Sequence, residues 1–369
     1  MKRKRHDDIG EMGLKHSLFK KKRIIALMLA LITGLAFCAC KTNETSQKET
    51  GTSLITVGFS QIGAESDWRL ASTSSMQGAF NSSLGYRLVY DDGQQKQENQ
   101  LKAMREFIDS EVDYIVLDPI TETGWDATLS EAKEAGIPVI LVDRKVSVED
   151  ESVYTAWVGS DFLLEGQRAC AWLKSYLNSI GYEDEINIAH LQGTFGSSAQ
   201  IGRSTALNET AALEGWNIIA EADADFVQAK GREVMESMLE QYGDMINVVY
   251  CENDSEALGA IEAIESYGKV AGANISAGEI LVISFDATKE GLKKTLEGKI
   301  ALDVECNPNY GIVAENIISD LEKNRNVVHE YYMEESLFSC IKNIETVNVD
   351  NTDYEVTNLT EDIVEGRNY

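Results

Sequence analysis

The sequence predicts an α/β protein of two lobes, each a parallel β-sheet covered by helices on both faces. Three observations support this prediction. Short apolar segments alternate with amphipathic segments along the chain, as parallel strands alternate with their crossover helices. This alternation runs through two successive series of similar character. The roughly 330 residues that follow the N-terminal segment exceed what one hydrophobic core usually organises.

The first series extends over residues 54–142. We expect strands at 54–59, 86–90, 114–117 and 139–142, and helices at 68–82, 95–109 and 124–135. Because right-handed crossovers join parallel strands, the loops after the strands gather at one edge of the sheet, where α/β proteins bind ligands. Those loops are 61–67, 91–94, 118–123 and 143–145.

The second series extends over residues 161–296. We expect strands at 186–191, 217–220, 246–250 and 280–285, and helices at 161–177, 198–213, 231–241, 255–267 and 289–296. The polar loops after these strands are 192–197, 222–230, 251–254 and 286–288. Two sheets with polar strand ends are expected to face each other across a cleft.

The N-terminal segment has the character of an export signal. Two basic clusters precede an apolar run at 24–37, which is short for a membrane span, and a polar segment follows at 41–53. This pattern is typical of a bacterial lipoprotein, with a signal peptide at 1–39, a lipidated Cys40 and a flexible linker at 40–53. The alternatives are lipidation of Cys38 and an uncleaved membrane anchor. With either a lipid anchor or an uncleaved membrane anchor, we expect the rest of the chain to lie outside the cytoplasm.

The charge of the body excludes nucleic acid as a partner. Residues 1–39 hold nine of the 33 basic and three of the 61 acidic residues, so the rest of the chain has 24 basic and 58 acidic residues. The resulting net charge is about −34. A surface of this sign repels phosphate backbones.

The cysteines and histidines of the body predict neither a metal site nor a cofactor site. Cys170, Cys251, Cys306 and Cys340 are widely spaced and form no Cys-x-x-Cys pair. Export permits a disulfide among them, but the sequence does not pair them. His190 lies in an apolar strand, which favours a histidine buried with its own hydrogen-bond partners. The sequence also contains no Gly-x-Ser-x-Gly motif and no phosphate-binding loop.

Polar and aromatic residues gather in the predicted loops at the strand ends. Carboxylates and amides bond to vicinal hydroxyls, arginine adds a planar fork of donors, and aromatic rings cover the apolar face of a sugar. A polyol therefore fits this set. The alternative is that Asp and Asn only cap helices there, although capping needs no arginine. The set is Glu65, Trp68, Arg69, Asp118, Asp143, Arg144, Arg203, Phe226, Asn253, Asp254 and Asp286.

Three segments carry a more specific resemblance. Residues 55–69 (ITVGFSQIGAESDWR), 92–100 (DGQQKQENQ) and 142–144 (VDR) resemble the sugar-binding proteins of bacterial ABC importers, the type I periplasmic binding family. Within that family they are most similar to galactofuranose-binding proteins. The segments LQGT at 191–194 and GREVMES at 231–237, together with Asn253 and Asp254, continue the similarity, which extends over about residues 54–309.

This resemblance implies a fold of two Rossmann-like lobes joined by a hinge that the chain crosses three times. The N-lobe would comprise 54–157 and 306–334. The C-lobe would comprise 158–305 and 335–369, with the part after Asn343 matching poorly. A sugar would bind between lobes that close by hinge bending, and the closed, monomeric form would dock on a permease.

The resemblance also implies roles for individual residues. Trp68 and Phe226 would sandwich the sugar ring. Arg69, Asp143 and Arg144 would hold hydroxyls from the N-lobe, and Arg203, Asn253 and Asp286 would hold them from the C-lobe. Glu305 is a candidate near the hinge. Asp118 stands where the galactofuranose-binding proteins have alanine, which leaves the exact sugar open.

Three other functions are compatible with parts of this pattern. Asp143 and Asp286 could act on a glycosidic bond, but neighbouring arginines favour their ionised forms, which suits recognition better than acid catalysis. A transcriptional repressor of this fold would need a helix-turn-helix where the signal sequence lies. A sensor module would present the closed form to a membrane receptor instead of a permease.

We expect Cys40 to carry the membrane anchor, because two or more acyl chains give stable retention where one does not. Cys40→Ser should release the protein into the medium or leave an uncleaved precursor, whereas Cys38→Ser should change little. Mass spectrometry of the N-terminal peptide is the direct test. An unmodified thiol at Cys40 with the leader still attached would favour the uncleaved anchor.

Overall fold

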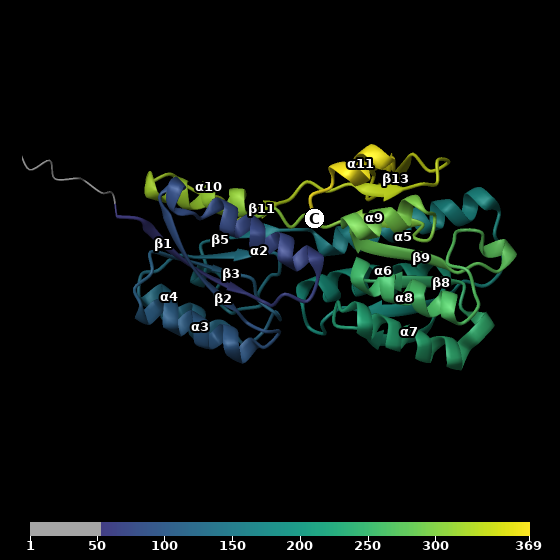
Figure 1. Ribbon diagram of the computed structural model, residues 1–369, viewed down its shortest axis with the longest axis horizontal. Helices are drawn as coiled ribbons and strands as arrows, with labels where there is room; N and C mark the ends of the chain where they lie inside the picture. Colours follow the sequence, from purple (N-terminus) through teal and green to yellow (C-terminus); the bar gives the residue numbers. More distant parts are fainter. Residues whose placement is uncertain (1–52) are drawn as a thin grey trace, which may run out of the picture. The chain divides into compact units, whose positions relative to one another are not determined.

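The computed structural model describes residues 53–369, which form one compact unit from Leu54 onward (Figure 1). The predicted signal peptide, the predicted lipidation site Cys40 and most of the predicted linker lie outside the described residues. Among residues 53–369, no helix combines the length and the apolar character that crossing a membrane requires. The α/β class with two largely parallel sheets is confirmed.

The first sheet has six parallel strands in the order β11-β5-β4-β3-β1-β2. Helices α2 and α10 pack on one face, and α3 and α4 pack on the other (Figure 1). The elements are β1 (Ile55–Gln61), α2 (Asp67–Ala79), β2 (Tyr86–Asp92), α3 (Gln97–Asp109), β3 (Tyr114–Leu117), α4 (Asp126–Glu134), β4 (Val139–Val142), β5 (Ala156–Gly159), α10 (Gly311–Glu322) and β11 (Glu330–Tyr332).

The second sheet has eight strands in the order β13-β14-β12-β10-β9-β8-β6-β7. Helices α5 and α6 cover one face, and α7 and α8 cover the other. The elements are α5 (Phe162–Ile180), β6 (Asn187–Gln192), α6 (Ser198–Glu214), β7 (Asn217–Asp223), α7 (Gln228–Tyr242), β8 (Val248–Cys251), α8 (Asp254–Ser266), β9 (Leu281–Asp286), α9 (Lys289–Leu296), β10 (Leu302–Glu305), β12 (Leu337–Ser339), β13 (Thr346–Val349), β14 (Thr352–Asn358) and α11 (Glu361–Gly366).

The chain passes between the two groups of elements three times. The crossings follow β5, follow β10 and precede β12. Of the strands, β1 to β5 and β11 belong to the first sheet, and β6 to β10 with β12 to β14 belong to the second. The exact lobe boundaries stay a prediction.

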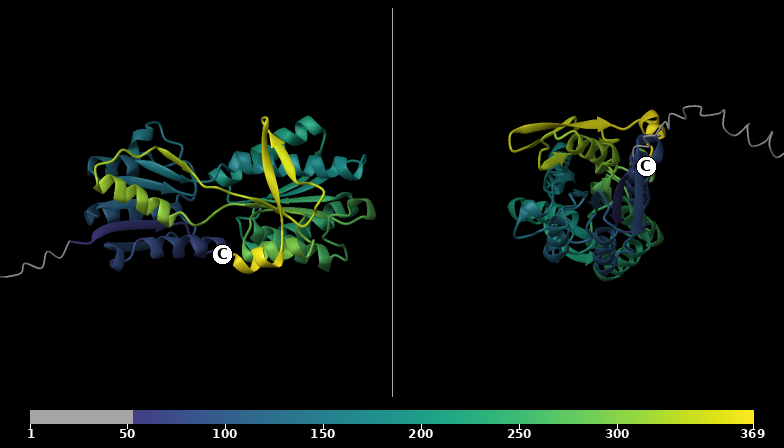
Figure 2. Two further views of the ribbon diagram at one scale, coloured as in Figure 1. Left: turned by 90° about the horizontal axis from the view of Figure 1, so that it is seen from above. Right: turned by 90° about the vertical axis from the view of Figure 1, so that its left-hand side faces the viewer.

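The tail after residue 335 adds structure that the sequence patterns did not predict. Strand β12 runs antiparallel to β10, β14 pairs parallel with β12, and β13 closes an antiparallel hairpin with β14 (Figure 2). Strand β13 lies beside α5, and α11 lies beside α9. Strands β13 and β14 are largely exposed, and β12 is buried but has only three residues, so none of them has the continuous apolar run that marks a buried parallel strand. Strand β10 was missed because its sequence, LDVE, alternates with acidic residues that are nevertheless buried.

His190 confirms the prediction of a buried histidine with its own partners. Its Nδ1 lies 3.0 Å from the Glu221 carboxylate and its Nε2 lies 2.9 Å from the Glu252 carboxylate, so β6 is tied to both of its neighbouring strands. Burial opposes the charged imidazole, but the bonds to Glu221 and Glu252 outweigh it and raise the pKa of His190. The four cysteines of the described chain are free thiols.

Because the folded state raises the pKa of His190, its charge stabilises the fold fully below the unfolded value of about 6.5, and this contribution is lost as pH rises through the folded pKa. We therefore expect the free energy of unfolding of the wild type to fall above about pH 6.5 relative to that of His190→Gln. Urea unfolding at several pH values measures the difference. His329→Gln is the control and should keep the wild-type pH dependence. Parallel pH curves for the wild type and His190→Gln would contradict the assignment.

Candidate functional site

A cavity lies where the loops of the two sheets meet, and its empty space, including the part that is open to solvent, is about 310 Å³. The first sheet's elements contribute Glu65, Ser66, Trp68, Arg69, Asp143 and Arg144, the second sheet's elements contribute Phe162, Ala199, Arg203, Phe226, Asn253 and Asp286, and the crossing after β10 contributes Cys306. Nine of the twelve candidate residues named from the sequence therefore lie around one cavity, and Asp118, Asp254 and Glu305 do not line it.

The loops on the two sides of the cavity touch each other. The backbone N–H of Glu122 donates to the carbonyl of Gly196 over 3.0 Å, and the backbone N–H of Lys145 donates to Ser198 Oγ over 2.9 Å. The Arg144 guanidinium lies 5.2 Å from the centre of the Phe226 ring. The structure therefore has the lobes closed over the cavity.

Arg69 is the centre of the N-lobe side of the cavity. It lies in the first turn of α2, where Ser66 caps the helix by accepting from the Arg69 backbone N–H. Its Nε donates to Glu65 over 3.0 Å, and its Nη1 donates to Asp118 over 2.5 Å and to Asp143 over 3.0 Å. Burial opposes the charge, but the three carboxylates outweigh it and raise the pKa of Arg69.

Asp118 lies behind Arg69 and is not part of the cavity lining. The residue is fully buried, and its Oδ1 has no hydrogen-bond partner among residues 53–369. Burial raises the pKa of Asp118 well above its usual value despite the opposing charge of Arg69. In this geometry Asp118 contacts Arg69, and its contact with a ligand stays a prediction.

Asp143 and Arg144 follow β4 on a strained turn. Asp143 has a φ of 60°, a left-handed conformation that is uncommon for residues other than glycine. This turn directs the Asp143 carboxylate to Arg69 and to Tyr310, whose hydroxyl lies 3.3 Å away. Arg144 donates through Nη1 to the carbonyl of Ile120 over 2.7 Å. Burial, followed by the charge of Arg69, lowers the pKa of Arg144.

Arg203, on α6, occupies the corresponding place on the C-lobe side. Its Nε donates to Glu165 over 2.7 Å, and its Nη1 donates to the carbonyl of Glu252. Its Nη2 lies 3.6 Å from the Asp286 carboxylate, which is beyond hydrogen-bond distance. The guanidinium also faces the Phe285 ring at 4.7 Å.

Asn253 lines the cavity and caps a helix at the same time. Its Oδ1 accepts from the backbone N–H of Glu256 over 2.9 Å at the start of α8, and its Nδ2 donates to the carbonyl of Phe226 over 3.4 Å. Asn253 therefore caps a helix, as the alternative explanation for the loop residues predicts, and it also lies at the cavity wall.

The two aromatic residues that the sequence analysis predicted for the site, Trp68 and Phe226, are fixed in different ways. Trp68 donates through Nε1 to the carbonyl of Cys306 over 2.6 Å and meets Tyr310 edge to face at 6.0 Å. Phe226 has a φ of 61° and packs on Gly193, where an added Cβ would come within 1.9 Å of its ring. Gly193 is thus required for the ring to reach the cavity.

Glu305 lies outside the cavity lining. Its carboxylate accepts from the Arg367 guanidinium and, over 2.8 Å, from the Tyr369 hydroxyl. Both partners belong to the C-terminal tail, so the environment of Glu305 is set by a segment in which the sequence patterns predicted no elements. The geometry brings this candidate to the hinge but not to the cavity.

Several residues of the site escaped the sequence analysis. Phe162 and Cys306 line the cavity, and Glu165 holds Arg203 from behind. Glu165 had a usable signal, because it is an acid between Leu164 and Gly166 on a helix whose neighbouring positions are largely buried. Cys306 had none, since a lone cysteine after a short strand indicates no particular contact.

Three polar atoms of the lining residues are buried and have no hydrogen-bond partner among residues 53–369. They are Glu65 Oε2, Arg144 Nε and Arg203 Nη2. A buried polar group without a partner costs free energy of about 1–3 kcal/mol. The cavity therefore offers two charged donors and one charged acceptor to a ligand that has both kinds of group.

Comparisons with known proteins agree with this architecture. The family described as "Periplasmic binding protein domain" matches residues 57–313. The galactofuranose-binding protein of Escherichia coli is 38% identical over 273 residues, which cover 73% of this chain and 83% of that protein. The chain therefore belongs to the periplasmic binding protein family, and its type I fold, predicted from the resemblance, is confirmed.

Two solved structures are also similar. One is a Mycobacterium smegmatis protein in complex with β-D-fucofuranose, with a TM-score of 0.72 and 37% identity, covering 77% of this chain and 91% of that one. The other is the binding protein of an arabinose ABC transporter from Shewanella sp. ANA-3, bound to α- and β-L-arabinofuranose, with a TM-score of 0.70 and 36% identity over 77% of this chain and 91% of that one.

The Arg69 cluster predicts unequal costs for its members. Arg69→Met leaves the buried carboxylates of Glu65 and Asp118 without the cation that binds them, and it leaves Asp143 with Arg144 alone, so the free energy of unfolding should fall by at least the roughly 3–5 kcal/mol seen when one partner of a buried pair is removed. Asp118→Asn should cost less than this range, because Arg69 keeps Glu65 and Asp143 and the amide still offers an acceptor. Urea unfolding of both variants at neutral pH tests the order. An equal or larger loss for Asp118→Asn would contradict it.

Proposed function

We propose that this protein is an extracytoplasmic sugar-binding protein that captures a monosaccharide in its furanose form and delivers it to the permease of an ABC importer. The observation that carries the proposal is the set of buried atoms of Glu65, Arg144 and Arg203 that lack partners among residues 53–369. A polyol supplies acceptors for the two guanidinium groups and a donor for the carboxylate.

The aromatic residues of the cavity support a ring-shaped ligand. Trp68 and Phe226 present apolar surfaces at the cavity wall, and such surfaces cover the C–H face of a sugar. Arg69, Asp143, Asn253 and Asp286 add hydroxyl partners on both sides of the ring. Because both lobes contribute, binding favours the closed arrangement over an open one.

The relatives favour furanoses. The named ligands of the similar proteins are galactofuranose, β-D-fucofuranose and L-arabinofuranose, and all three are five-membered rings. We place galactofuranose first, followed by arabinose, galactose and ribose. Asp118 affects which sugar binds through Arg69, because it occupies the Nη1 donor of Arg69, which is then not available to a ligand.

Transport is favoured over the other functions because the relatives named above are binding proteins, one of them a transporter component. The protein is then no enzyme, works as a monomer and uses no cofactor. Lipidation of Cys40 would keep it at the outer face of the cell membrane, within reach of the permease. A sensor presenting the same closed form to a receptor is the second candidate, and the neighbouring genes discriminate between them.

A thermal-shift screen of free pentoses and hexoses tests the proposal. A ligand present at a hundred times its dissociation constant should stabilise the protein by about 2.7 kcal/mol. Amino acids and peptides serve as the contrasting set. Stabilisation by that set, with none by any sugar, would refute sugar binding, and release of product from an aryl furanoside would indicate an enzyme.

Arg144 is expected to matter most among the polar contacts. Arg144→Ala removes a buried donor, together with the cation beside Asp143, and losses of this kind cost roughly 2–5 kcal/mol, which is more than tenfold in affinity. Arg105→Ala is the matched control, since Arg105 is an exposed arginine paired with Glu131 on the surface. Calorimetry on the folded variants measures both. Wild-type affinity in Arg144→Ala would refute the assignment of the site.

A further inference from the structure

The three crossing segments meet at one carboxylate. Glu335, just before β12, accepts a hydrogen bond from the Ser160 hydroxyl after β5 and, over 3.2 Å, from the backbone N–H of Asn307 after β10. The side chain of Glu335 is 4% exposed. All three inter-lobe connections are therefore joined through a single buried side chain at the hinge.

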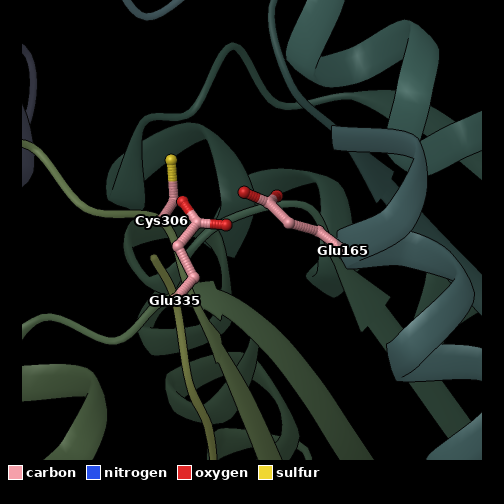
Figure 3. Close-up of side chains that lie close together, drawn as sticks. All are labelled: Glu165, Cys306 and Glu335. Atoms are coloured by element: carbon pink, nitrogen blue, oxygen red, sulfur yellow. The ribbon is translucent and has the colours of Figure 1, made fainter. Parts of the chain in front are cut away.

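Glu165 faces this junction from α5 and also holds the cavity arginine. Its Oε2 accepts from Arg203, whereas its Oε1 is buried and has no hydrogen-bond partner among residues 53–369. One ligand atom from each of Glu165, Cys306 and Glu335 lies within 4.8 Å of the others, and Figure 3 shows the Glu165 carboxylate pointing toward the other two side chains. Arg203 binds Glu165 over 2.7 Å, and Arg168 lies 3.5 Å from Glu335. Two buried carboxylates this close still repel each other, and a proton on the pair removes this repulsion.

The surroundings of the pair favour a proton over a metal ion. Burial raises the pKa of the Cys306 thiol well above its usual value, and a thiol that keeps its proton is a poor metal ligand. A dication would also lie close to the Arg203 and Arg168 guanidinium groups. Burial raises the pKa of Glu165 despite the charge of Arg203, and burial together with the charge of Glu165 raises that of Glu335.

The other charged and titratable groups that face the pair come from seven elements. They are Arg168 on α5, Arg203 on α6, Asp143 after β4, Tyr250 on β8, Asp286 at the end of β9, Cys306 after β10 and Tyr310 at the start of α10.

We propose that Glu165 and Glu335 share one proton when the lobes are closed, so that this pair couples the contact between Arg203 and the sugar to closure of the hinge. The proposal rests on the function proposed above. Glu165 is then a positioning residue, since it fixes Arg203 and does not line the cavity. Closure brings the pair together and takes up the shared proton, and opening lets both carboxyls ionise.

The sign of the pH effect follows from this linkage. The closed form binds one proton more than the open form between the open-state pKa, about 4.3 for an ordinary Glu, and the raised closed-state pKa. Sugar affinity should therefore fall by up to tenfold per pH unit as pH rises through this window. Calorimetry in two buffers of different ionisation heat should show proton uptake on sugar binding.

Glu335→Gln removes the titration of this side chain while keeping its size and an acceptor oxygen for Ser160 and Asn307. Its sugar affinity should be nearly independent of pH, with no proton uptake from this pair. Glu165→Gln should also lose the pH dependence and should bind more weakly, since a neutral acceptor holds Arg203 less firmly. Glu334→Gln, the same change at the adjacent exposed position, is the control and should behave as the wild type. Equal pH dependence in the wild type and Glu335→Gln would overturn the proposal.

A measurement without sugar separates this proposal from the proposed function. Small-angle X-ray scattering of the sugar-free protein should show a smaller radius of gyration at the acidic end of the window in the wild type, and no change with pH in Glu335→Gln. This comparison tests the hinge even if no sugar binds, and identical scattering behaviour of both proteins would refute it. Stabilisation by ZnCl₂ that Cys306→Ser abolishes would show a cation in place of the proton, which also refutes it.

Discussion

The closed arrangement depends on buried arginines that are held by more carboxylates than they need. Arg69 faces three acids, and Arg203 faces Glu165 and Asp286. Moving a guanidinium group out of water costs free energy unless its N–H donors form hydrogen bonds. Where several carboxylates surround the group and compensate its charge, one N–H donor can stay available to a ligand. Arg203 Nη2 is such a donor. Arg69 and Arg203 are each held by partners from their own side of the cavity, which limits the ordering cost of binding.

Much of this organisation could be predicted because it follows from strand topology. Asp143 and Asp286 come directly after or at the end of β4 and β9, and the carboxyl ends of parallel strands share one edge. The left-handed φ of both residues has no sequence signal beyond the tolerance of Asp for that conformation. Sequence reasoning thus placed these residues at the site, but it could not give the direction of their side chains.

The parts that could not be predicted depend on contacts between distant segments. Glu305 was predicted as a candidate near the hinge, but its partners Arg367 and Tyr369 could not be predicted, because the tail from which they come carries no clear pattern. Glu335 likewise gives no signal, because an acid between two strands is normally solvated. Only the meeting of three chain crossings buries it. Hydrophobic patterns with a period of 2 or 3.6 residues indicate which side of a single strand or helix is buried. They do not indicate where segments that are distant in sequence meet.

Asn253 shows why capping and ligand contact are poor alternatives in this fold. A helix that starts directly after a parallel strand needs a cap at the sheet edge where ligands collect, so one residue type satisfies both demands. Arginine is different, since it caps no helix N-terminus and its burial requires partners. The residues that distinguish a recognition site from ordinary strand-to-helix turns are therefore Arg69, Arg144 and Arg203. Arg144 Nε and Arg203 Nη2 have no hydrogen-bond partner among residues 53–369, and these unused donors indicate a polar ligand.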